Sequence, residues 1–130
     1  MASNWTDIKI VELDEAATGP SGQGALVRIV LKLSQSAPSE WAEYFNNAWS
    51  QHIYMMKRRA SVSGRTLEIV CMPNELEEDH LPELKKIIAE TNQAYGAYAN
   101  EQTRRRQEQE EIAQRQKDEL AQLKGRLKLD

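Results

Sequence analysis

The carboxy-terminal third of the chain is a long run of helix-forming residues with almost no apolar side chains. Residues 83–129 contain no proline and only two glycines, Gly96 and Gly125. Within this run, residues 100–119 contain just two apolar side chains. At about 1.5 Å per residue, the run predicts a single helix roughly 70 Å long. Because so polar a helix gains little from packing on its own chain, we expect it to pair with another helix or to serve as a spacer.

Large apolar side chains return near the end of this predicted helix, and we call Ile112, Leu120, Leu123 and Leu127 the helix tip. The three leucines are three and four residues apart, which places them on one face of a helix. Continuing their register backwards brings glutamine and arginine to successive core positions, a poor seam for a long parallel dimer. Ile112 lies one residue away from the position that this register assigns to the seam, and moving the register by one residue to include it does not remove the polar core positions.

Two readings of the predicted helix remain open. In the favoured one, the helix tip docks on a partner protein or on a second copy of the chain. In the other, the helix is an exposed spacer. Its end is then either a free tail or a tail that becomes ordered only when a partner protein binds it.

Core-forming side chains are concentrated before residue 100, and this predicts two parts. Residues 1–99 hold enough apolar side chains for a modest two-layer head domain. Residues 100–130 are expected to form a charged helical stalk that continues the last helix of the head. The chain is therefore expected to combine a small folded domain with an extended helix.

Two pairs of strand-like runs predict two antiparallel hairpins in the head. The first pairs residues 8–13 with 25–33 across a turn rich in glycine, and the second pairs residues 55–63 with 66–72 across Ser63-Gly64. With the helices between and after them, the order is strand, strand, helix, strand, strand, helix. The predicted fold class is α+β: a small antiparallel four-stranded sheet, a helix packed on one face, and a long C-terminal helical extension.

The helix between the hairpins is expected to start at Pro38, which suits the first position of a helix. Its apolar stripe, at the spacing of an amphipathic helix that packs on a sheet, consists of Trp41, Tyr44, Phe45, Ala48 and Trp49. An irregular helical turn is expected at Glu75–Asp79, before the long helix opens at Pro82. The side of the long helix that is predicted to face the sheet consists of Leu84, Ile87, Ile88, Thr91, Ala94, Tyr95 and Tyr98.

The overall charge gives no general case for binding nucleic acid or an anionic membrane, because the net charge is −3 and the pI is near 5.5. Basic residues nevertheless gather in the head, and on paired strands they could line one sheet face and bind phosphates or an acidic protein surface. This predicted basic face consists of Arg28, Lys32, Lys57, Arg58, Arg59 and Arg65. Nucleic acid is the alternative partner that it suggests, although a protein is favoured.

The residues that most often carry chemistry form no recognisable motif. His52, His80 and Cys71 have no metal-ligand spacing, and Cys71 lies on the apolar side of its predicted strand, which predicts a buried, inert thiol. A group of acids beside a helix start is expected to complement the helix dipole or to form a solvated face: Glu75, Glu77, Glu78 and Asp79. We therefore expect no catalytic site, no metal site and no cofactor, with a small enzyme of unknown class as the alternative.

The amino terminus has neither the basic nor the apolar region of a signal peptide, and no apolar run approaches the length of a membrane span. These features predict a cytoplasmic protein that does not bind membranes. The leading hypothesis is a non-catalytic protein–protein interaction module, of the adaptor, regulator, chaperone or inhibitor type. Its partner is expected to be another protein or a second copy of the chain.

Overall fold

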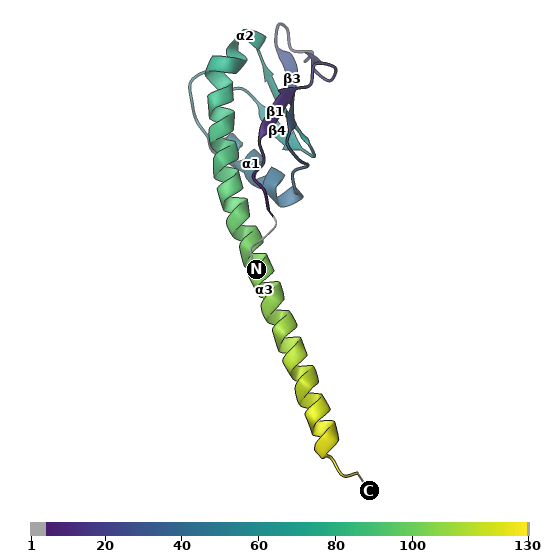
Figure 1. Cartoon of the computed structure of the whole chain (residues 1–130). Coiled ribbons are helices and arrows are strands. Elements are labelled where there is room, and N and C mark those ends of the chain that lie inside the picture. Colours follow the sequence, from purple (N-terminus) through teal and green to yellow (C-terminus); the bar gives the residue numbers. More distant parts are fainter. Residues whose placement is uncertain (1–4, 130) are drawn as a thin grey trace. The chain divides into compact units, whose positions relative to one another are not determined.

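The computed structural model describes residues 5–129 and confirms the α+β class (Figure 1). The chain forms two compact units. The first, which we call the head unit, runs from Thr6 to Tyr95 and contains the sheet. The second, the helical unit, consists of the chain from Gly96 onward together with Trp5. Each unit is described separately below.

The head unit is built on an antiparallel sheet with the strand order β1-β3-β5-β4. Both predicted hairpins are present, since β1 pairs with β3 and β4 pairs with β5. The sheet has five strands and not the predicted four, because the two-residue β2 in the glycine-rich turn also pairs with β3. The strands are β1 Ile10–Leu13, β2 Gly19–Pro20, β3 Val27–Leu33, β4 Ala60–Ser63 and β5 Thr66–Cys71.

The strand predicted over residues 55–63 is shorter than expected, because β4 begins only at Ala60. Residues 53–59 form a loop, in which Met56 adopts a left-handed backbone with φ of 61°. A β-strand cannot continue through this conformation, so strand pairing starts after it. Alternating side chains alone did not reveal this break.

The helices follow the predicted order: α1 Ser39–Gln51, α2 Pro73–Glu75, η1 Leu76–His80 and α3 Leu81–Arg126. The irregular turn expected before the long helix is a five-residue π-helix, η1. Pro82 lies two residues after its end, in the first turn of α3. Proline cannot donate a backbone hydrogen bond and crowds the preceding turn, so the wider π turn lies where a regular helix would be strained.

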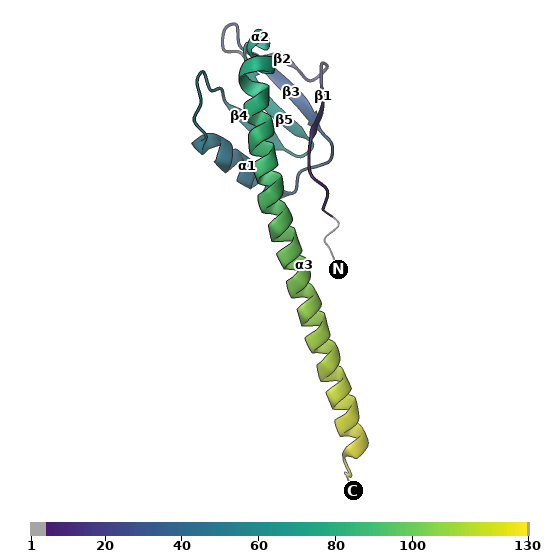
Figure 2. The same cartoon turned by 60° about the vertical axis from the view of Figure 1, so that its left-hand side comes forward.

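One face of the sheet carries the core, and α1 lies over that face beside the first part of α3 (Figure 2). Alternation along β3 and β5 turns the same set of side chains inward, as the sequence predicts. The rings of Trp41, Phe45 and Trp49 stack in a row along α1, with neighbouring centroids 5.8 and 6.1 Å apart. The buried core includes Ile29, Leu31, Leu33, Val62, Leu67, Ile69, Leu84, Ile87 and Ile88.

Two tyrosines that were predicted to face the sheet are partly exposed. Tyr44 leaves 45% of its surface exposed because it lies at the margin of the α1 stripe, whereas Trp41 and Phe45 are fully buried. Tyr98 leaves 46% exposed and belongs to the helical unit, beyond the end of the head unit at Tyr95. The predicted core face of α3 was therefore one turn too long.

A buried asparagine joins three parts of the head unit. The Oδ1 of Asn92 accepts hydrogen bonds from the Ile8 backbone N–H at 2.9 Å and from the Trp41 indole N–H at 3.0 Å. Its Nδ2 donates to the Ile8 carbonyl at 2.8 Å. Because all three bonds are buried, Asn92 fastens α3 both to α1 and to the segment that leads into β1.

Candidate functional site

Four polar side chains meet in the head unit where loop 53–59 approaches α2 and η1. The guanidinium of Arg58 donates two hydrogen bonds to the carboxylate of Glu75, from Nε at 3.2 Å and from Nη2 at 3.0 Å. Oε2 of that carboxylate, which accepts the bond from Nε of Arg58, also lies 2.9 Å from Nε2 of His80. The Nδ1 of the same histidine lies 2.8 Å from the hydroxyl of Tyr54. We call Tyr54, Arg58, Glu75 and His80 the polar cluster.

The surroundings of the polar cluster shift the pKa values of Glu75 and Tyr54. The hydrogen bonds from Arg58, and then from His80, lower the pKa of Glu75 from 4.5 to about 2. Burial raises the pKa of Tyr54 from 10.0 to about 12. Glu75 is therefore a carboxylate and Tyr54 a neutral phenol. Nε2 of His80 can donate to Glu75 while Nδ1 accepts from the phenol, so both ring nitrogens have hydrogen-bond partners.

This arrangement suits a structural role better than acid–base chemistry. His80 has no exposed surface and Glu75 is 8% exposed, so a substrate has no access to either group. The expectation that Glu75 lies on a solvated face was wrong, whereas Glu77, Glu78 and Asp79 are exposed. The signal that could have identified Glu75 is its position, because it alone of the four acids precedes the π turn that brings His80 back to it.

The remaining residues with reactive side chains are held in a similar way. Cys71 is fully buried, as predicted, and burial raises the pKa of its thiol from 9.0 to about 11. A thiol in this state is a weak nucleophile. His52 is half-buried, with Nε2 3.4 Å from the carboxylate of Glu83. Among residues 5–129, no three His, Cys, Asp or Glu side chains are arranged to hold a metal ion.

The polar cluster fixes a loop that displays apolar side chains to solvent. We call Ile53, Met55 and Met56 the apolar loop; Ile53 and Met55 leave 89% and 86% of their surfaces exposed. Tyr54, between them, points the other way and bonds to His80. Lys57 closes the loop by donating to the carbonyls of Trp49 and His52. The side-chain pattern of residues 55–63 predicts a strand, so the loop was not expected.

The structure does not gather the six residues of the predicted basic face on one sheet face. Arg28 and Lys32 lie on β3 and form ion pairs with Glu68 at 2.5 Å and with Glu12 at 3.1 Å. Arg58 bonds to Glu75, and Lys57 is bound to backbone carbonyls. The other two lie apart: Arg65 donates to the carbonyls of Leu33 and Ser34, and Arg59 is exposed in the loop before β4.

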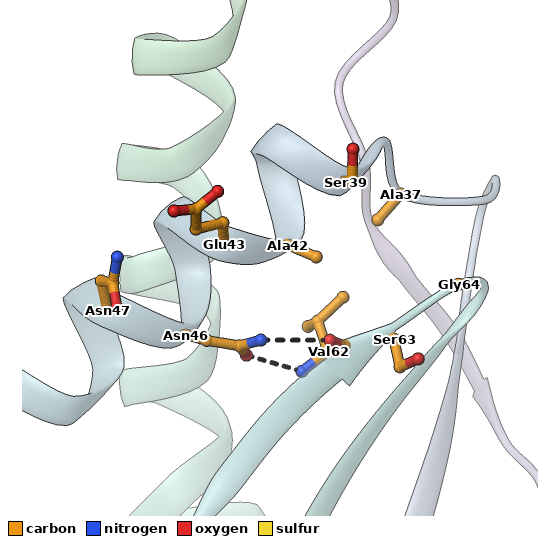
Figure 3. Close-up of a pocket in the computed structure, with 9 residues that line it drawn as sticks. All are labelled: Ala37, Ser39, Ala42, Glu43, Asn46, Asn47, Val62, Ser63 and Gly64. Atoms are coloured by element: carbon orange, nitrogen blue, oxygen red, sulfur yellow. Dashed lines mark hydrogen bonds between the residues drawn. The ribbon is translucent and has the colours of Figure 1, made fainter.

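A shallow cleft of about 500 Å³ lies between α1 and the turn that joins β4 to β5 (Figure 3). Asn46 points across it and forms two hydrogen bonds with the backbone of Val62, from Nδ2 to the carbonyl at 3.2 Å and from the amide N–H to Oδ1 at 2.8 Å. The asparagine thus occupies backbone groups of edge strand β4 that could otherwise pair with another strand. Glu43 is the only ionisable side chain that lines the cleft.

The helical unit presents the helix tip to solvent. Ile112, Leu120, Leu123 and Leu127 are all exposed, with between 40% and 65% of their surfaces accessible. Every described residue after Gln107 is also exposed. Nearer the head unit, Glu101 forms ion pairs with Arg104 and Arg105, and Arg104 also pairs with Glu108. These pairs link residues three or four apart and support the exposed helix weakly.

Comparisons with known proteins add no relative: no family model, no curated protein and no solved structure matches this chain. Within the described part of the chain, no helix is long and apolar enough to cross a membrane.

Proposed function

We propose that this protein is a non-catalytic protein-interaction module, in which the helix tip contacts another protein chain. The observation that carries the proposal is the exposure of four large apolar side chains in and just after a helix whose described residues beyond Gln107 are all exposed. Exposed apolar side chains at three- and four-residue spacing are typical of helices that pack against another helix. An isolated helix of this composition is also only marginally stable in water.

The head unit supports an interaction role in a second way. Its buried titratable groups are not available to a substrate: Glu75 and His80 hold loop 53–59, and Cys71 is buried with a raised pKa. That loop displays the apolar loop residues on a fixed backbone. A rigidly held apolar loop is a suitable contact surface, because little conformational entropy is lost when a partner binds it.

Nucleic-acid binding is the weaker alternative. Binding of phosphates needs cationic groups that are free to approach them. Of the six basic residues named for that role, five are engaged within the head unit, and only Arg59 has no partner among the described residues. This distribution favours a protein partner.

The proposal is tested by replacing the leucines of the helix tip in the full-length chain with glutamine, at Leu120, Leu123 and Leu127. Glutamine keeps a high helix propensity, so the change removes apolar surface without disfavouring the helix. The matched control, Ala121→Gln, adds the same side chain on another side of the helix. Helix content, measured by circular dichroism, should be similar in all three proteins.

A photoreactive amino acid at Gln122 reports the contact directly. We expect cross-links to another protein chain, either in the purified protein or in extract from the source cells, in the otherwise unchanged chain and with Ala121→Gln. The triple glutamine variant should lose them. Equal cross-linking in the triple variant, or none in any sample, would show that the helix tip is not a contact site.

A further inference from the structure

The charges of the helical unit are arranged in bands along the helix. An acidic band consists of Glu108, Glu110 and Glu111. A basic band consists of Lys124 and Arg126 in the last turn of α3 and of Lys128, which lies two residues past its end. Glu108 is already paired with Arg104 of the same helix. The other five residues of the two bands form no ion pair among residues 5–129. Among the described residues, the two bands of opposite charge are thus unpaired apart from Glu108, and they lie on either side of Asp118.

We propose that the helix tip binds a second copy of this chain in the antiparallel direction, with the two helices crossing near Asp118. This inference rests on the proposed function and names its partner. In a parallel dimer in register, each charged band would lie against the same band of the other copy, and like charges would repel. In the antiparallel dimer, the acidic band of each copy lies against the basic band of the other, so both ends are complementary.

The same crossing point also brings the apolar side chains together. Counting equal distances from Asp118 places Leu123 of one copy level with Ala113 of the other, next to Ile112. Leu120 lies just beyond the crossing point in both copies, so the two Leu120 side chains are separated by about one helical turn along the axis. Ile112, which does not fit the leucine register of a parallel seam, thus becomes a neighbour of Leu123 in the partner copy.

The separation and the charges of the two bands define the length and the charge pattern that a binding helix needs. The acidic and basic bands are about 16 residues apart, which corresponds to roughly 24 Å of helix. A binding helix must repeat the two bands at that separation in the reverse order. A second copy of this chain does so by symmetry, and it also supplies Ile112 and Ala113 beside Leu123.

Charge exchange tests the antiparallel arrangement, with self-association of the full-length chain measured by sedimentation equilibrium at low salt. The first variant carries Glu110→Lys and Glu111→Lys, which leaves the Arg104–Glu108 pair intact. The second carries Lys124→Glu and Arg126→Glu, and the third combines all four changes. We expect each of the first two to raise the dimer Kd at least tenfold and the combined variant to recover most of the loss.

The combined variant also serves as the control for helix stability. Acids near the end of a helix disfavour it through the helix dipole, and this cost is present in both the second and the third variants. Recovery in the third variant therefore reports charge pairing between copies. If the first two variants dimerise as tightly as the natural chain, or if the combined variant stays as weak as they are, the antiparallel arrangement is wrong.

A distance measurement tests orientation independently. A spin label at Gln107→Cys can be attached selectively, because the natural Cys71 is fully buried. Antiparallel helices crossing near Asp118 place the two labels about 33 Å apart along the axis, whereas parallel helices in register place them roughly 10 Å apart. Short distances would overturn the inference while leaving the proposed function standing. If the chain is monomeric at all concentrations but cross-links to a different protein through Gln122, the antiparallel dimer is likewise wrong and the proposed function still stands.

Discussion

Replacement of Asn92 by alanine is expected to destabilise the head unit more than any other substitution of a polar side chain on α3. The amide group of Asn92 forms three buried hydrogen bonds, two with Ile8 and one with Trp41, at 2.8 to 3.0 Å. Alanine removes all three and leaves two buried donors and one buried acceptor without partners. At about 1–2 kcal/mol for each of the three unsatisfied groups, the free energy of unfolding should fall by roughly 3–6 kcal/mol.

The assay is equilibrium unfolding in urea, followed by circular dichroism so that no tryptophan signal is needed. Gln93→Ala is the matched control, because it removes a similar amide from the next residue of α3, where the side chain is exposed. That variant should stay within about 0.5 kcal/mol of the natural protein. A loss below about 1 kcal/mol for Asn92→Ala would refute the assignment of Asn92 as the group that joins α1, α3 and the segment before β1.

A double-mutant cycle separates the hydrogen bond to the indole from the other two. Trp41→Phe removes the indole N–H that donates to Oδ1 of Asn92, together with part of the buried ring. Because the two residues share this bond, the effects of Trp41→Phe and Asn92→Ala should not add, and the double variant should be less damaged than their sum by about 1 kcal/mol. Simple additivity would show that the bond contributes nothing to stability.

Three further predictions concern the polar cluster and the helical unit. Arg58 lowers the pKa of Glu75 to about 2, so the stability that this carboxylate contributes is fully present above pH 4.5 and is lost as the pH falls toward 2. Glu75→Gln should therefore make the free energy of unfolding less dependent on pH in this range. Glu77→Gln, at an exposed position, should not. Burial raises the pKa of Tyr54 to about 12, so its contribution is present below pH 10 and is lost as the pH rises toward 12. Tyr54→Phe should reduce that loss of stability at alkaline pH. At neutral pH it should lower the free energy of unfolding by about 1–2 kcal/mol, because Nδ1 of buried His80 loses its partner. An unchanged dependence of stability on alkaline pH would contradict the burial of the Tyr54 hydroxyl. At Gly125, an added Cβ would meet nothing within 4 Å. Gly125→Ala should therefore stabilise the end of α3 by up to about 1 kcal/mol and raise the helix content measured by circular dichroism. A decrease in helix content would indicate that this segment is not helical in solution.

Much of the head unit could be predicted from local patterns in the sequence. The alternation of β3 and β5, the two hairpins and the stripe of α1 all appear in the structure close to their predicted positions. Each of these features depends on side-chain periodicity, which is a local property of the chain. The π turn before Pro82 was also anticipated, as an irregular helical turn, because a proline so close to a helix start constrains the residues before it.

The polar cluster could not be predicted in the same way. Glu75 looks like its exposed neighbours Glu77 and Glu78 in the sequence, and its burial depends on Arg58, which lies 17 residues away. The start of β4 at Ala60 was equally hidden, because loop 53–59 is held by contacts between Tyr54 and His80 and not by its own side-chain pattern. These features arise from pairings between distant parts of the chain.

The long helix that most constrains this protein was determined by the sequence itself. Strong helix formers, the absence of proline and the return of leucines near the end were sufficient to predict α3 and its apolar side chains. The tertiary structure alone decided where the core face of that helix ends and which polar residue on it is buried: Asn92 belongs to the core and Tyr98 does not. The physical reason is that helix formation depends on neighbouring residues, whereas burial depends on which distant groups the fold brings within hydrogen-bonding and packing distance.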